Sequence, residues 1–223
     1  MKAYNDFSDE RLRGGCVYCN QAATTRDHIP AKAFLNKPYP ANLHVVPSCK
    51  KCNNSFSKDE AYVAYLIKYI SEMQTNDEYL ETETTLSHSG ALQKRLLNAT
   101  HCNNGEMSID IEVNRVKNVI TKFAVAHMLY EFGEKRLIRP DHISFAFINQ
   151  MNSTEIDKFN KPISEELFPE IGSRWMQRVV ETGSDWVIVQ LNKYRYYLYS
   201  APTNFIRIVI GELLYCEVMW ENV

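Results

Sequence analysis

The sequence predicts an α+β protein in which a ββα unit, clamped by cysteines, precedes a helical and antiparallel β region. Three features of the 223 residues lead to this prediction. Two Cys-x-x-Cys pairs enclose residues 16–52, a long central stretch carries apolar residues at helical spacing, and aromatic and branched residues alternate towards the end. The polar, acidic segment 74–90 separates the two regions. We therefore expect one domain over 1–75 and a second, α+β domain over 76–223.

Four of the six cysteines form two matched pairs, separated by 29 residues. Each Cys-x-x-Cys turn points both sulfurs the same way, so two such turns can close a tetrahedron around zinc. Gly15 precedes the first pair and supplies a backbone that is free to bend there. Disulfides or a redox motif are the alternative interpretation. The predicted ligands of a structural Zn²⁺ are Cys16, Cys19, Cys49 and Cys52.

The segment between the cysteine pairs predicts two short strands joined by a loop. Residues 24–30 and 42–47 are β-prone, and each run ends in a proline. Apolar residues at helical spacing then predict a helix over 53–72, which Ser48 is placed to cap. The expected order is strand, loop, strand, helix, with a cysteine pair at each end.

Beyond this unit we expect a short helix, a turn, a strand, a long amphipathic helix and four strand-like segments. Hairpin turns are placed at Asn192 and Gly211, which are turn-forming residues between alternating runs. The expected elements span 91–99, 101–105, 108–113 and 114–132 for the first four, and 143–149, 175–181, 186–200 and 205–220 for the strands.

Charge is distributed unevenly along the chain. Residues 1–58 carry nine Lys or Arg against four Asp or Glu, whereas residues 59–223 carry 16 against 23. A basic end of this kind fits a polyanion such as a nucleic acid. No apolar run approaches the ~20 residues that span a bilayer, and the first residues lack the apolar core of a secretory signal. We therefore expect no membrane association and a cytoplasmic location.

A carboxylate, two amides and a histidine accompany the cysteines. Asp27 and His28 end the first strand, Asn42 opens the second, and Asn53 follows the last cysteine. Carboxylate and amide oxygens suit Mg²⁺ or Mn²⁺, and a histidine can take a proton from water near neutral pH. Together they suit the hydrolysis of a phosphodiester. Adjacent strand residues face opposite ways, so Asp27 and His28 can serve one metal only where the strand is distorted.

The pattern Cys-x2-Cys, Asp-His-Ile-Pro, Asn-Leu-x-Val-x-Pro-Ser-Cys-x2-Cys-Asn resembles the HNH endonucleases, the zinc-bound ββα-metal nucleases, over residues 16–62. The resemblance implies that His28 is the general base and that Asn42 holds this base in position. It also implies that Asp27 and Asn53 bind a catalytic Mg²⁺ or Mn²⁺. Asn53 departs from the family pattern, which often has histidine at this position. A further carboxylate ligand could then come from the next turn, from Asp59 or Glu60.

DNA is the substrate that the resemblance implies, and some stand-alone nucleases of this kind are effectors of antiphage defence. The acidic remainder of the chain would then bind a regulatory protein partner or form a homodimer. The alternative is a zinc-stabilised module that binds nucleic acid or protein and has lost its catalytic site; Asn53 and the overall acidity favour it. The expected phosphate contacts are Arg13, Arg26, Lys32, Lys37, Lys51 and Lys58.

Overall fold

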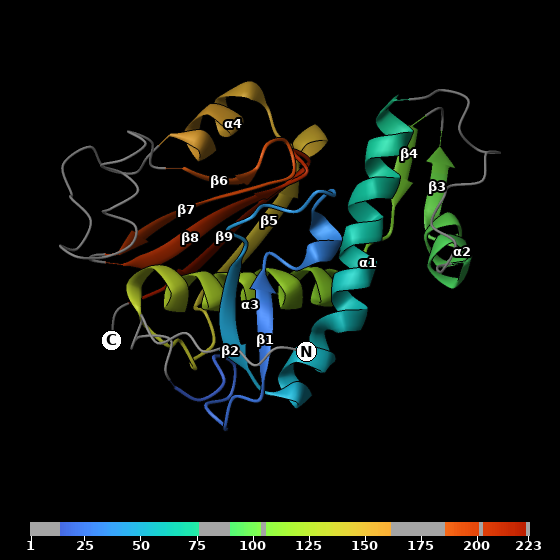
Figure 1. Ribbon diagram of the computed structural model, residues 1–223. Helices are drawn as coiled ribbons and strands as arrows, with labels where there is room; N and C mark the ends of the chain where they lie inside the picture. The colour runs from blue at the N-terminus through green and yellow to red at the C-terminus, as the bar shows by residue number, and fades with distance from the viewer. Residues whose placement is uncertain (1–13, 76–89, 104–105, 162–185, 201–202, 222–223) are drawn as a thin grey trace.

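The computed structural model describes residues 14–75, 90–103, 106–161, 186–200 and 203–221 (Figure 1). Over these ranges the chain is an α+β protein with four α-helices and antiparallel sheets. The strand expected over 175–181 and the expected phosphate contact Arg13 lie outside the described residues. No helix in the described ranges combines the length and the apolar character that crossing a bilayer requires.

The largest sheet has five antiparallel strands in the order β5-β9-β8-β7-β6. These strands are β5 (His142–Phe147), β6 (Val187–Gln190), β7 (Tyr194–Ser200), β8 (Asn204–Ile210) and β9 (Leu214–Trp220). The turns of the β6–β7 and β8–β9 hairpins lie where they were predicted, since Asn192 and Gly211 have positive φ values of 58° and 65°. Every residue of the central strand β8 is buried, so this strand is covered on both faces.

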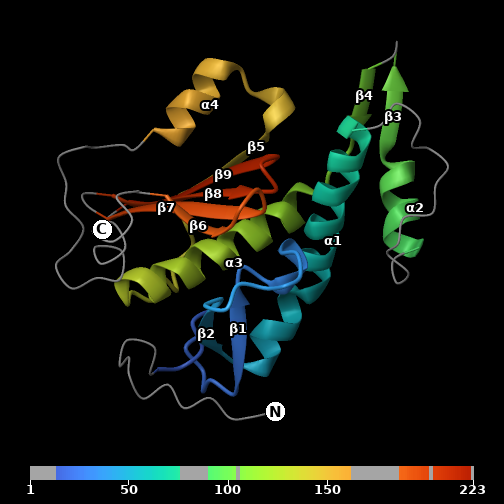
Figure 2. The ribbon, with the colours of Figure 1, turned by 45° about the horizontal axis from the view of Figure 1, so that its top comes forward.

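Helix α3 (Val113–Phe132) is the central element of the fold. Figures 1 and 2 show it between the five-stranded sheet and a hairpin of strands β1 (Thr25–Ile29) and β2 (His44–Ser48). Residues 122–129 are all buried, which means that this part of α3 has packing partners on every side. The hairpin and the sheet therefore both pack against helix α3.

Helix α1 (Lys50–Thr75) follows β2 directly and packs against both β1 and α3. It starts three residues before the expected 53–72 because Cys49 takes the capping position: its Sγ accepts the N–H of Cys52 at 3.4 Å. Ser48, the predicted cap, instead donates its hydroxyl to the carbonyl of Cys49 at 3.2 Å. The first turn of α1 is thus built around a cysteine sulfur.

A small hairpin lies on the far side of α1, beside helix α2 (Gly90–Asn98), which falls within one residue of the prediction (Figure 1). Its strands are β3 (Thr100–Asn103) and β4 (Glu106–Ile109). The turn predicted over 101–105 is therefore wrong in part, because residues 101–103 are paired strand. The strand predicted over 108–113 begins earlier and ends at Ile109.

One helix, α4 (Ser153–Asn160), was not predicted. Asn152 caps it: its Oδ1 accepts the N–H of Glu155 at 3.0 Å, and a Glu155 carboxylate oxygen accepts the N–H of Asn152 at 2.9 Å. This reciprocal pair is a capping box, and the sequence Asn-Ser-Thr-Glu carried its signal.

The buried apolar side chains form one cluster that runs from Val17, between the first two cysteines, to Trp220 in β9. The cluster includes residues of α1, α3 and the five-stranded sheet. The ββα segment and the rest of the chain consequently share a core. The predicted domain boundary after residue 75 lies at the start of 76–89, outside the described residues.

Candidate functional site

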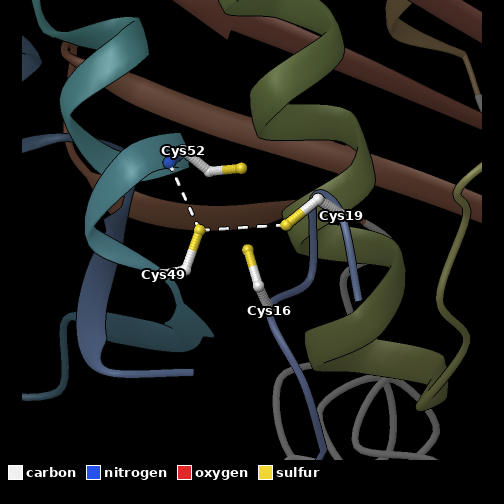
Figure 3. Close-up of side chains that lie close together, drawn as sticks. All are labelled: Cys16, Cys19, Cys49 and Cys52. Atoms are coloured by element: carbon white, nitrogen blue, oxygen red, sulfur yellow. Dashed lines mark hydrogen bonds between the residues drawn. The ribbon is translucent and has the colours of Figure 1, made fainter. Parts of the chain in front are cut away.

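The four paired cysteines meet at one end of the β1–β2 hairpin, with their sulfurs turned toward one another (Figure 3). All four Sγ atoms lie within 4.8 Å of one another, and those of Cys19 and Cys49 are 3.8 Å apart. A tetrahedron with Zn–S bonds of ~2.3 Å places its sulfurs about 3.8 Å apart. The cluster can therefore hold a structural metal such as zinc. The alternative of disulfides is wrong, because all four thiols are free.

Hydrogen bonds prepare one of these sulfurs to bind as a thiolate. Burial raises the pKa of the Cys16 thiol, but the backbone N–H groups of Cys49, Tyr18 and Cys19 bond to its sulfur and bring the pKa down to about 7. These donors favour the deprotonated form of Cys16, whereas burial and the neighbouring sulfurs raise the pKa of the Cys52 thiol. Among the described residues, the four cysteines are the one group of three or more Cys, His, Asp or Glu side chains arranged to hold a metal ion.

The loop that carries the first cysteine pair is fastened from two directions. Within the loop, Cys16 donates its N–H to the Gln21 carbonyl at 2.6 Å. From outside, Lys135, which follows α3, donates to the Gly15 carbonyl at 2.9 Å and to Asn20 Oδ1 at 3.1 Å. The cysteine cluster thus joins the start of β1, the start of α1 and the end of α3.

Replacing Gly15 with alanine is expected to break the cysteine loop. A Cβ at this position would collide with the Asn20 carbonyl and would lie 2.8 Å from the Gln21 carbonyl oxygen. Both obstacles are backbone, so the loop must open, and we expect the free energy of unfolding to fall by about 3 kcal/mol. Zinc content and thermal unfolding measure the effect. In the control Gly90→Ala the new Cβ meets no atom within 4 Å. Equal zinc content and equal melting of both variants would contradict this account of the loop.

Asp27, the expected ligand of a catalytic metal, is buried and already bonded. Its Oδ2 accepts the Tyr18 hydroxyl at 2.8 Å, and its Oδ1 accepts the Lys122 ammonium at 3.0 Å. The same ammonium binds Glu60 on α1. Lys122 is a residue of α3, so this ion pair connects β1, α1 and α3.

His28 lies on the other face of β1. The strand is regular and pairs His28 with Val45 and Asp27 with Val46, so the two neighbouring side chains point in opposite directions. His28 is half-buried, and exposed Arg26 shares its face. Burial, and then the charge of Lys32, lower the pKa of His28 below its ordinary value of 6.5. Its imidazole is consequently uncharged at neutral pH.

Asn53 lies in the first turns of α1, and Asn42 lies in the turn before β2. The Asn53 amide donates to the carbonyl of Arg26 at 3.0 Å, which fastens α1 to β1. The Asn42 side chain is exposed. His44, on the inner face of β2, stacks on Tyr130 of α3 with ring centroids 4.0 Å apart.

The expected phosphate contacts are distributed over two parts of the ββα segment. Arg26 lies on the outer face of β1, and Lys32 lies in the short 3-10 helix η2 (Lys32–Phe34), where its charge affects His28. Lys37 is exposed in the loop that follows. Lys51 and Lys58 are exposed on α1. Arg26 and Lys32 are therefore the cations best placed to act together with His28.

This region contains two residues that were not predicted from the sequence, Tyr18 and Lys122. Lys122 lies among apolar positions of an amphipathic helix, and a charge at such a position was a signal that it has a buried partner. The side chains proposed as further metal ligands, Asp59 and Glu60, both face α3: Asp59 accepts the Asn118 amide at 2.6 Å, and Glu60 binds Lys122.

Comparisons with protein families, with curated proteins and with solved structures found no match to this chain.

Proposed function

We propose that this protein is an endonuclease that hydrolyses DNA phosphodiester bonds, as the HNH endonucleases that it resembles do, with His28 as the general base. The position of His28 carries the proposal. This histidine lies half-buried on the outer face of a hairpin that a cysteine cluster fastens to the following helix, with Arg26 on the same face. Strand, strand and helix follow in the order of the nuclease family.

The chemistry assigned to these residues is simple. Because the pKa of His28 is lowered, its imidazole has a free nitrogen at neutral pH and can take a proton from the attacking water. Arg26 and Lys32 would bind the phosphate oxygens and offset the charge that develops on them. A zinc ion held by four sulfurs has no open position for water, so zinc would support the hairpin and take no part in the reaction.

The resemblance also implies a Mg²⁺ or Mn²⁺ ion on Asp27 and Asn53, and the Asp27 carboxylate does not fit that assignment. Both oxygens of Asp27 accept hydrogen bonds, one from Tyr18 and one from Lys122. Asn53 donates its Nδ2 to the backbone of β1, a bond that does not involve its oxygen. No step of the proposed hydrolysis is therefore assigned to a metal at these residues.

A second candidate function has an observation in its favour. The Asp27–Lys122 ion pair occupies the carboxylate that an active HNH site would use, which suits a zinc-stabilised module that binds DNA without cutting it. Both candidate functions place DNA on the basic outer face of the hairpin. They differ only in whether the protein cleaves the bound DNA.

Incubation with supercoiled plasmid separates the two functions. The zinc-loaded protein is mixed with plasmid in buffer that contains MgCl₂ or MnCl₂, and topology and mobility are measured on gels. Conversion to open circles supports the nuclease. Retarded but intact supercoiled DNA at every metal concentration would overturn the nuclease and favour the binding module.

Reversal of the charges beside His28 is expected to weaken DNA binding. Each phosphate contact releases counterions, so Arg26→Glu or Lys32→Glu should lower affinity and reduce the salt slope of binding by about one. Fluorescence anisotropy with a labelled duplex over a range of salt concentrations measures both quantities. Lys161→Glu is the control, because Lys161 is exposed at the end of α4, across the sheet from the hairpin (Figure 1). Equal losses in all three variants would remove the assignment of the DNA face.

A further inference from the structure

A single ammonium group is buried between two carboxylates where the ββα segment meets α3. The Lys122 side chain is 1% exposed, and its Nζ lies 2.8 Å from Asp27 Oδ2 and binds Glu60. The Tyr18 hydroxyl supplies a further bond to Asp27 at 2.8 Å. The Phe56 ring lies 5.5 Å from the ammonium. The cation is thus surrounded by two anions, a phenol and an aromatic ring.

One ammonium bonds to both acids without a metal ion and offsets one of their two charges. A carboxylate removed from water needs a cation or hydrogen bonds, and Asp27 has both. Burial raises the pKa of Glu60, and the nearby Lys122 opposes this shift. The Lys122 amine belongs to the same chain as the two acids, and helix α3, which is buried on every side there, holds it beside them. Its effective concentration at the two carboxylates is therefore high.

A divalent ion at Asp27 would have to displace this ammonium. Mg²⁺ binds carboxylate oxygens at ~2.1 Å and would meet the Lys122 Nζ at close range, where two cations repel strongly. The long Lys122 side chain would then need a new partner inside the core, although its neighbours Val119, Ile120 and Phe123 are fully buried and apolar. The fold therefore favours the ammonium.

We infer that the Lys122 ammonium is the resident cation of the Asp27–Glu60 carboxylate pair, in the place that the nuclease resemblance gives to a divalent metal. Asp27 is thereby a structural residue that fastens β1 to α3, and the wild-type protein binds no divalent ion through it. Removal of the ammonium uncovers a divalent cation site made by Asp27 and Glu60. The inference concerns cation binding and stands whether or not the chain cuts DNA.

Mn²⁺ binding to the zinc-loaded protein tests this inference, with free Mn²⁺ measured by electron paramagnetic resonance. Wild type and Asp27→Asn should bind Mn²⁺ equally. Lys122→Ala should gain one Mn²⁺ site that the wild-type protein lacks, and the double variant Lys122→Ala/Asp27→Asn should lose it again. A wild-type protein whose Mn²⁺ affinity falls when Asp27 becomes Asn would overturn the inference, and so would a folded Lys122→Ala variant without the new site.

A second measurement uses the wild-type protein alone, since the variants have altered cores. The ammonium protons of buried Lys122 should exchange slowly with water and be visible by ¹⁵N NMR. Added Mg²⁺ should leave this signal in place. Its loss or shift as Mg²⁺ saturates the protein would mean that the metal displaces the amine, which contradicts the inference. Plasmid cleavage enters neither measurement, so failure here and failure of the proposed nuclease function are distinguishable.

Discussion

Removal of zinc, by a strong chelator or by Cys49→Ser, is expected to unfold the N-terminal part of the protein. The four sulfurs join the loop before β1 to the first turn of α1, and Cys49 also caps that helix. A two-stranded hairpin has little stability of its own. Zinc binding to such sites contributes on the order of 10 kcal/mol, as much as the whole stability of an ordinary domain. Circular dichroism and zinc content, measured on the same samples, should fall together.

Cys102→Ser provides the matched control for the cysteine substitution. Cys102 is exposed in β3 and lies outside the sulfur cluster, so its variant should retain both zinc and the wild-type melting temperature. A Cys49→Ser protein that is well folded without zinc would contradict the assignment of the cluster as a structural metal site.

The features that could be predicted from the sequence are those that depend on residues close together in the chain. The spacing within each cysteine pair predicted a metal-binding turn, since a Cys-x-x-Cys turn is a local structure. Turn residues such as Asn192 and Gly211 marked the hairpins because few other residues adopt positive φ easily. The helix over 114–132 followed from its apolar periodicity. In each case a short segment contains the whole signal.

The environment of Asp27 could not be predicted in this way. Its partner Lys122 lies 95 positions later in the chain, and periodicity does not state which helix packs on which strand. The regular geometry of β1 also resolves the conflict between Asp27 and His28, because the strand remains undistorted and the two side chains face opposite sides. The sequence alone could not show whether β1 is regular or distorted, because it does not show how α3 packs against this strand.

His28→Ala is expected to reduce DNA cleavage by about 10² to 10⁴, the usual contribution of a general base. The substitution removes one side chain from the outer face of β1, the face opposite to the one that carries Asp27. Zinc content, melting and DNA affinity should therefore stay near the wild-type values. Protonated imidazole cannot accept a proton, so the wild-type rate should rise with pH. Because the pKa of His28 is lowered, the midpoint of this rise should lie below pH 6.5.

The rate of plasmid nicking by purified His28→Ala protein, beside wild type from the same preparation procedure, tests the proposed nuclease most directly. The account predicts that wild type converts supercoiled plasmid to open circles and that the variant, with equal zinc and equal DNA affinity, does so at least about 100-fold more slowly. Nicking by His28→Ala at the wild-type rate would contradict the account and remove His28 from the chemistry.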